Sequence, residues 1–216
     1  MKKRLLFVIF LFASVTLTAQ TVGPFEKEII SFEKADSVNP PKKQQVLFIG
    51  SSSFRLWSDF SERFKDYAVI NRGFGGSELS DITLYAHRIL IPYRPSKVFI
   101  YGGENDISHD QSAAQVFKEF VELYNLVSKE LPDTRFYYIS PKLSPSRLKY
   151  RSQLEEFNKK VSAFIKKQPC NWTFIDVYHP MLSADGSTKA ELFLSDKLHM
   201  TSKGYDIWEK LIREHM

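Results

Sequence analysis

A run of three serines and a spaced Asp-His pair give this 216-residue chain side chains suited to nucleophilic chemistry. Ser51, Ser52 and Ser53 follow a short apolar run and one glycine in "VLFIGSSS". Asp196 and His199 stand three residues apart in "SDKLHM", near the C-terminus. A serine hydroxyl is a weak nucleophile until a neighbouring base accepts its proton, and a histidine oriented by a carboxylate is such a base. The three residue types therefore fit acyl transfer to a serine.

Two further segments offer hydrogen-bond donors for the oxyanion that such a reaction forms. The segment "NRGFGGS" contains Gly76, and "GGEND" contains Asn105. The backbone N–H groups of Ser52 and Gly76 and the side-chain amide of Asn105 could together supply three donors. Taken singly, each feature has an ordinary structural explanation, because serines cap helices while glycines and Asn-Asp pairs form turns. The combination is what favours a hydrolytic site.

Short apolar segments that alternate with amphipathic ones must position these residues. We expect five strands, over residues 46–49, 67–71, 97–102, 135–140 and 172–177. Most of them are nearly continuous apolar runs, which is typical of a parallel sheet buried on both faces. Repeated strand-helix units predict an α/β sandwich with right-handed crossovers, in which the loops after the strands carry the site.

Helical spacing is clearest in the segment 112–131. Its apolar residues recur at steps of four, three and four: Val116, Phe120, Leu123 and Val127. Ser112 followed by Gln115 predicts a capping box at the start of this helix. A last helix is expected over about residues 201–213.

The first twenty residues have the features of a secretory signal peptide. Lys2, Lys3 and Arg4 precede an apolar run, Leu5–Val15, that is too short to span a bilayer. We therefore expect cleavage near residue 20 and a secreted or periplasmic mature protein without stable membrane insertion; an N-terminal membrane anchor is the alternative. Residues 21–45 are expected to form a polar lead-in with one short helix over 25–37, and residues 46–216 a single domain.

The charge of the chain argues against a nucleic-acid partner. The formal net charge is +5, from 30 basic and 25 acidic side chains, and loss of three basic residues with the signal peptide leaves +2. No cluster of Lys and Arg is interleaved with aromatic residues. The single cysteine, Cys170, cannot form an internal disulfide and is expected to be a small buried residue. The histidines and carboxylates lack metal-binding spacing, so we expect neither a metal nor a cofactor.

Four sequence blocks resemble, in their order, those of the SGNH hydrolase superfamily, also called GDSL-type lipases and esterases. The blocks are "FIGSSS", "GFGGS", "GGEND" and "DKLH", and the resemblance covers nearly the whole mature chain. It implies a catalytic triad of Ser52, Asp196 and His199, and an oxyanion hole formed by Ser52, Gly76 and Asn105. It also implies a flavodoxin-like, three-layer α/β/α sandwich with a five-stranded parallel sheet in the order 2-1-3-4-5.

The chain is similar to the branch that contains platelet-activating-factor acetylhydrolase subunits, whose second block also reads Gly-x-Gly-Gly. A secreted bacterial subgroup with "GSSS" and "RLW" resembles it more closely. The chain departs from the family pattern at Ser51, because an Asp usually precedes the nucleophile and no carboxylate stands there. A shift of the motif by one residue would make Ser51 or Ser53 the nucleophile.

These observations predict a secreted serine esterase that hydrolyses small acyl esters, such as O-acetylated carbohydrate, without a cofactor. The loops at 140–150 and 178–194 are polar, and no long apolar insertion suits a long acyl chain. A lysophospholipase, arylesterase or thioesterase of the same family is an alternative, and so is a module that binds glycan or protein without turnover. The remaining histidines are expected to be structural: His87, His109, His179 and His215. The sequence assigns neither substrate-binding residues nor an oligomeric state.

Overall fold

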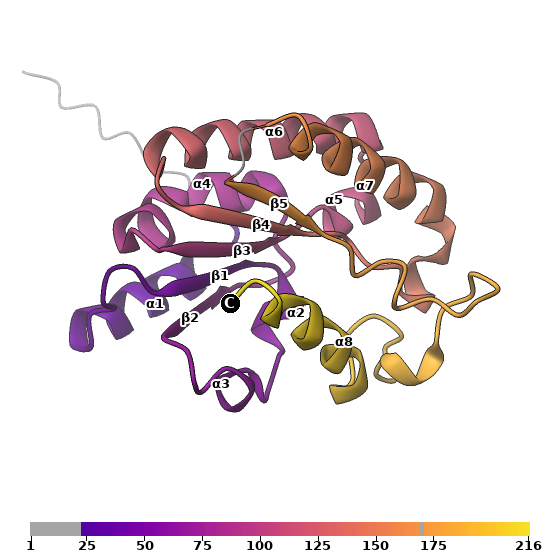
Figure 1. The fold of residues 1–216 in the computed structure, drawn as a ribbon, viewed down its shortest axis with the longest axis horizontal. Helices are drawn as coiled ribbons and strands as arrows, with labels where there is room; N and C mark the ends of the chain where they lie inside the picture. Colours follow the sequence, from indigo (N-terminus) through magenta and orange to yellow (C-terminus); the bar gives the residue numbers. More distant parts are fainter. Residues whose placement is uncertain (1–22, 169–170) are drawn as a thin grey trace, which may run out of the picture.

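Five parallel strands form one sheet in the order β2-β1-β3-β4-β5, as predicted (Figure 1). The structure is a computed structural model that describes residues 23–168 and 171–216, so the expected signal peptide and Cys170 lie outside the described residues. The strands are β1 Val46–Gly50, β2 Val69–Gly73, β3 Lys97–Tyr101, β4 Arg135–Ile139 and β5 Trp172–Ile175.

Helices cover both faces of the sheet, which confirms the three-layer α/β/α architecture (Figure 1). One face packs against α1, α4, α6 and α7, and the other against α2, α3 and α8. The helices are α1 Glu26–Val38, α2 Ser52–Arg55, α3 Phe60–Arg63, α4 Leu79–Ile89, α5 Glu104–Ser108, α6 Ala113–Glu130, α7 Arg151–Ile165 and α8 Ser202–Arg213. Short 3-10 segments lie at Ile91–Tyr93, Pro145–Tyr150 and Ala190–Leu192.

Successive side chains of each strand enter opposite layers, which explains why the strands are continuous apolar runs in the sequence. Phe48, Phe99 and Tyr137 are register partners on β1, β3 and β4. Their rings stack in a row, with 4.7 Å between successive centroids, in the layer of α2, α3 and α8. Leu47 and Ile49 point the other way, into the core that α4 and α6 share.

The helix α6 begins and packs as its sequence predicts. Ser112 N–H donates to Gln115 Oε1 (2.9 Å), and Gln115 N–H donates to Ser112 Oγ (3.3 Å), so the capping box is formed. The apolar residues that recur at helical spacing are all fully buried: Val116, Phe120, Leu123 and Val127. The last helix starts one residue after its predicted start, at Ser202.

Three strands end within one residue of their predicted bounds, and β2 and β5 differ by two residues. The strand β2 begins at Val69 and continues to Gly73, because its pairing with β1 extends until Gly50 lies opposite Gly73. Asn71 therefore lies in the middle of the strand rather than at its end. The strand β5 ends at Ile175, two residues earlier than predicted.

The expected lead-in contributes a helix, α1, that packs against the rest of the sandwich. Ile29 on this helix is fully buried in the core. Arg88 on α4 forms an ion pair with Glu26 at 2.8 Å. Glu28 Oε2 accepts the backbone N–H of Gly75 (3.0 Å), so α1 also contacts the glycine-rich segment of the predicted site.

Ile29→Ala should lower the free energy of unfolding by about 2–5 kcal/mol, because it empties a fully buried position in the α1 interface. Ile30 provides the matched control, since it lies on the same helix but is 37% exposed. Ile30→Ala should change the free energy by less than about 0.5 kcal/mol. Urea unfolding of residues 21–216 measures both effects. Equal effects of the two substitutions would show that α1 does not belong to the cooperative fold.

Candidate active site

Ser52, His199 and Asp196 meet at the carboxyl end of the sheet, although 147 positions separate Ser52 from His199. Ser52 Oγ lies 3.0 Å from His199 Nε2, and His199 Nδ1 lies 2.6 Å from Asp196 Oδ2. A histidine that donates its Nδ1 proton to a carboxylate presents a bare Nε2, which can accept a hydrogen bond from the serine hydroxyl. The structure thus brings together the three residues predicted as a triad, in the hydrogen-bonding order that general-base catalysis needs.

A tight turn holds Asp196 and His199 in this geometry. Asp196 Oδ1 accepts the backbone N–H groups of Leu198 (2.9 Å) and His199 (3.0 Å), a common arrangement when aspartate opens a turn. Partial burial opposes ionisation of this carboxyl, but the hydrogen bonds from the His199 ring and from the two N–H groups outweigh it. The pKa of Asp196 is therefore lowered to about 2, and the group is a carboxylate at neutral pH.

Ser52 lies at the end of a sharp turn between β1 and α2, residues 50–52, which we call the serine turn. Gly50 ends β1 so close to β3 that a Cβ there would lie 2.1 Å from the carbonyl oxygen of Tyr101, so the position requires glycine. Ser51 is the N-cap of α2, and Ser52 is its first residue. Because the first N–H groups of a helix have no partner within the helix, the backbone N–H of Ser52 is available to an oxyanion.

The three consecutive serines have different surroundings. The hydroxyl of Ser52 contacts His199. Ser51 and Ser53 are both buried, and Ser53 Oγ accepts a hydrogen bond from Lys142 at 3.4 Å. The geometry therefore favours Ser52 over either neighbour as the nucleophile.

Gly76 and Asn105, the other predicted oxyanion donors, lie next to each other. A Cβ on Gly76 would be 3.7 Å from Asn105 Nδ2. Asn105 Nδ2 donates to the carbonyl oxygen of Ser77 (3.1 Å), and its second N–H remains for another acceptor. The backbone N–H of Phe74 donates to the carbonyl oxygen of Gly50 (2.9 Å), which places the glycine-rich segment beside the serine turn.

Asp106, expected to form a turn with Asn105, is fully buried and joins the two donor segments. Its Oδ1 accepts the N–H of Leu79 (2.9 Å), and its Oδ2 accepts the N–H of Gly103 (3.0 Å). Burial raises the pKa of this carboxyl to about 8, although hydrogen bonds from the backbone N–H groups of Leu79 and of Asp106 itself act to lower it. Asp106 thereby fixes the start of α4 relative to the segment that carries Asn105.

Asn71 and Lys142 also support the site, and neither was predicted to do so from the sequence. Asn71 Nδ2 donates to the carbonyl oxygen of Phe54 (2.9 Å), which attaches β2 to α2. Lys142 lies in the loop after β4 and contacts Ser53. The rule that site residues follow strand ends indicates Lys142, because it lies three residues after Ile139, the last residue of β4.

A second Asp-x-x-His pair has the same local geometry as the first. His179 Nδ1 lies 2.6 Å from Asp176 Oδ2. The His179 ring is 77% exposed, whereas the His199 ring is 19% exposed and contacts Ser52. His109, expected at a surface position, is exposed and lies 2.5 Å from Glu78.

Residues 23–168 and 171–216 hold no cluster of three or more His, Cys, Asp or Glu arranged to bind a metal ion. None of the helices in this part of the chain combines the length and apolar character needed to cross a membrane.

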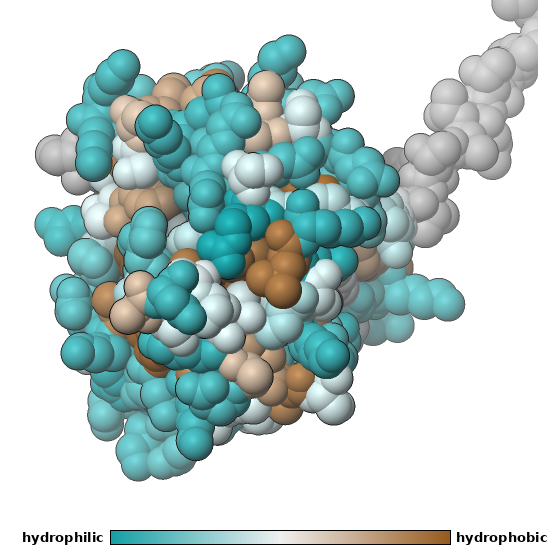
Figure 2. Space-filling view, turned by 90° about the vertical axis from the view of Figure 1, so that its right-hand side faces the viewer, coloured by the Kyte–Doolittle hydropathy of each residue, from teal (hydrophilic) through white to brown (hydrophobic). Residues whose placement is uncertain are grey.

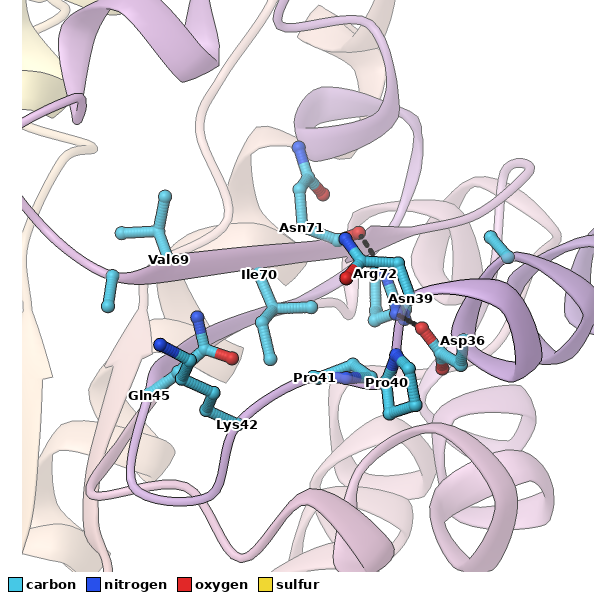
Figure 3. Close-up of a pocket in the computed structure, with 12 residues that line it drawn as sticks. Asp36, Asn39, Pro40, Pro41, Lys42, Gln45, Val69, Ile70, Asn71 and Arg72 are labelled. Atoms are coloured by element: carbon cyan, nitrogen blue, oxygen red, sulfur yellow. Dashed lines mark hydrogen bonds and ion pairs between the residues drawn. The ribbon is translucent and has the colours of Figure 1, made fainter.

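A hollow of about 530 Å³ lies between the end of α1 and β2, and Asn71 is one of the residues that line it (Figure 3). Asp36 and Arg72 in its wall form an ion pair with each other, and Tyr93 Oη donates to Asp36 (2.5 Å). None of the predicted site residues lines this hollow. Asp36 and Arg72 already pair with each other, and the described residues that line the hollow include no histidine or serine that could act as base or nucleophile, so it does not compete with the serine turn as a candidate for chemistry.

Figure 2 shows the side of the molecule on which the strands end. This face is mostly hydrophilic, and apolar side chains gather in a small patch near its centre. Two exposed leucines, Leu148 and Leu194, lie in segments that form backbone hydrogen bonds with the His199 turn. Leu194 N–H donates to the carbonyl oxygen of His199 (2.8 Å), and the 3-10 segment of Leu148 is joined to the turn by Ser146 N–H and Lys197 O (3.0 Å).

Residues 47–207 match the sequence model of a family described as the GDSL-like lipase/acylhydrolase family. No curated protein matches the chain.

Solved structures of several bacterial proteins share this fold. A Bacteroides fragilis protein described as an acylhydrolase is 21% identical, with 87% of this chain and 95% of that chain covered and a TM-score of 0.75. A Streptococcus pneumonia protein described as a platelet activating factor is 20% identical, with 88% and 91% covered and a TM-score of 0.77. A mutant of an acetyl-xylooligosaccharide esterase from Geobacillus stearmophilus is 13% identical, with 80% and 94% covered and a TM-score of 0.63. At these identities the likeness establishes the fold.

Asp196→Asn should make the free energy of unfolding less sensitive to acid. The pKa of Asp196 is about 2 in the folded protein, against about 3.9 in an unfolded chain. Its contribution to stability is therefore present above about pH 4 and is lost as the pH falls toward 2. Asparagine keeps the Oδ1 acceptor but does not titrate. Urea unfolding at pH 5 and pH 3 should show a larger loss of stability in the wild type, and equal losses would contradict an ionised, hydrogen-bonded Asp196.

Proposed function

This chain belongs to the GDSL-like lipase/acylhydrolase family, and we propose that it is a serine esterase that hydrolyses small acyl esters. Ser52 is the proposed nucleophile, His199 the base and Asp196 the residue that orients the base. The observation that carries the proposal is the 3.0 Å contact between Ser52 Oγ and His199 Nε2. This contact matters most because a serine hydroxyl reacts with an ester only when a base accepts its proton.

In the first half-reaction, Ser52 Oγ attacks the ester carbonyl carbon while His199 Nε2 accepts the hydroxyl proton. The tetrahedral oxyanion would accept hydrogen bonds from the N–H groups of Ser52 and Gly76 and from the amide of Asn105. The bond from the carbonyl carbon to the alcohol oxygen then breaks, and His199 returns the proton to that oxygen. Asp196 stabilises the imidazolium that exists between the two proton transfers.

In the second half-reaction, water attacks the acyl group on Ser52. His199 accepts a proton from the water and the same donors hold the second oxyanion. The bond between the acyl carbon and Ser52 Oγ breaks, His199 returns the proton to Ser52, and the carboxylic acid leaves. Acids, bases and hydrogen-bond donors of the chain supply every step, so we propose no cofactor.

A short acyl group fits the surroundings of Ser52 better than a long one. The face around the strand ends is mostly hydrophilic, with a small apolar patch (Figure 2). Leu148 and Leu194 are single exposed apolar side chains near the His199 turn, and they support binding of a short acyl group rather than a long chain. The solved acetyl-xylooligosaccharide esterase has the same fold. We therefore propose an ester of a short acyl group with a polar alcohol, such as an O-acetylated carbohydrate.

We also propose that the enzyme acts outside the cytoplasm. The proposal depends on the basic start and apolar run of residues 1–20, which have the pattern of a secretory signal peptide.

Ser52→Ala should lower the kcat for p-nitrophenyl acetate by at least roughly a thousandfold, because no other hydroxyl contacts the base in the described residues. Ser51→Ala should leave kcat within a few-fold of the wild type. A fluorophosphonate probe followed by peptide mass spectrometry should label the wild type at Ser52. A wild-type protein that neither hydrolyses the ester nor takes up the probe would favour a non-catalytic binding module instead.

The kcat/KM for p-nitrophenyl esters should be highest for acetyl and fall at least tenfold by octanoyl, because the face on which the strands end carries only a small apolar patch (Figure 2). A series from acetyl to palmitoyl measures this preference, and acetylated xylan tests release of acetate from a glycan. A preference for palmitoyl would overturn the short-acyl proposal. Faster hydrolysis of an acetyl thioester than of the matched oxygen ester would favour the thioesterase alternative.

A further inference from the structure

A buried ion pair lies beside the serine turn. Lys142 Nζ is 2.7 Å from Glu104 Oε2, and the two side chains are 1% and 5% exposed. Among the residues that the structure describes, Lys142 is the one lysine or arginine that is fully buried. Lysine side chains are almost never buried to this extent unless their charge is paired.

Lys142 reaches the serine turn through the same ammonium group. An ammonium has three N–H donors, and Lys142 Nζ has three acceptors: Glu104 Oε2, Ser53 Oγ (3.4 Å) and Tyr101 Oη (3.3 Å). Tyr101 Oη in turn donates to Glu104 Oε2. Burial and the neighbouring Glu104 carboxylate raise the pKa of Tyr101 well above its ordinary value, so the phenol keeps its proton and remains a donor. We call Ser53, Tyr101, Glu104 and Lys142 the buried cluster.

The buried cluster joins the segments that carry the two halves of the predicted site. Ser53 follows Ser52, the proposed nucleophile and first oxyanion donor. Glu104 precedes Asn105, the proposed side-chain donor. Lys142 comes from a third segment, the loop after β4, and contacts both neighbours.

Stability alone does not account for the buried cluster. Removing two charges from water costs more than their attraction commonly returns, and apolar residues of similar volume often stabilise a fold equally well or better. Glu104 Oε1 adds to this cost, because it is buried and has no hydrogen-bond partner within the described residues. The groups whose burial costs this free energy lie where the serine turn meets the Asn105 segment.

We propose that Lys142 and Glu104 are positioning residues that fix the distance between the nucleophile and the Asn105 donor. This inference rests on the proposed esterase function. An oxyanion donor must lie about 2.7–3.1 Å from the developing charge, and a displacement of about 1 Å can cost a hundredfold in rate. Lys142 sets this distance by binding the residue after Ser52 and the residue before Asn105 at one nitrogen atom.

The test replaces both charges together, because removal of one partner leaves an uncompensated buried charge that can unfold the protein. The double variant Glu104→Met/Lys142→Met keeps side-chain volume and removes the links to Ser53 and Tyr101. We expect its kcat for p-nitrophenyl acetate to fall at least tenfold, with KM within about threefold of the wild type and Tm within a few degrees. The rate of fluorophosphonate labelling at Ser52 should fall in parallel, since it depends on the same geometry.

The chain offers a matched control in an exposed Glu-Lys pair on α7. Glu156 Oε1 and Lys160 Nζ are 3.4 Å apart, with side chains 56% and 39% exposed. Glu156→Met/Lys160→Met should leave kcat, KM and the labelling rate within twofold of the wild type. This control separates an effect of the buried cluster from a general effect of replacing an ion pair.

Three outcomes decide the proposal. A folded Glu104→Met/Lys142→Met variant that keeps the wild-type kcat, with or without a lower Tm, would overturn the positioning role while leaving the esterase function intact. A wild-type protein without hydrolysis or labelling would overturn both. If the double variant does not fold, Ser53→Ala tests the proposal instead, because this substitution breaks the link to the serine turn and leaves the ion pair in place. It should lower kcat several-fold without a change in Tm, and unchanged kcat would overturn the proposal.

Discussion

The parallel pairing of β1 with both of its neighbours aligns the ends of three strands, and the segments of the candidate site begin at these ends. Gly50, the last residue of β1, lies opposite Gly73 of β2 on one side and opposite Tyr101 of β3 on the other. The serine turn, the glycine-rich segment and the segment of Asn105 therefore leave the sheet at the same height and in the same direction. An antiparallel neighbour would have sent one of these segments to the opposite end of the sheet.

Hydrophobic packing brings the histidine to this edge from the far end of the chain. The helix α8 contributes Tyr205 and Trp208 to the aromatic core beneath α2, where the Trp57 ring stacks on Tyr205 at 4.5 Å. Arg63 on α3 adds ion pairs to α8, with Asp206 (2.7 Å) and Glu209 (2.6 Å). The turn of His199 immediately precedes α8, so docking of this helix holds the imidazole against Ser52.

Much of the fold and of the candidate site could be predicted because both depend on short segments. Continuous apolar runs identify buried strands such as Val46–Gly50, and the capping residues Ser112 and Gln115 identify the start of α6. The bounds of β2 could not be predicted, because its last residues are strand only through their pairing with β1. The packing of α1 could not be predicted either, since a polar segment gives little sign that one residue, Ile29, enters the core.

The sequence alone determined the residue types and the local geometry of the turn that carries the histidine, because hydrogen bonds across three residues depend only on nearby backbone. It contains that turn twice: His179 lies 2.6 Å from Asp176, and His199 lies 2.6 Å from Asp196. Only the tertiary structure decided which of these rings meets a serine, since that contact spans 147 positions and follows from strand order and helix packing. The burial of Lys142 between two distant segments was decided in the same way, because a lysine in a polar loop shows its partners only when the loop has folded.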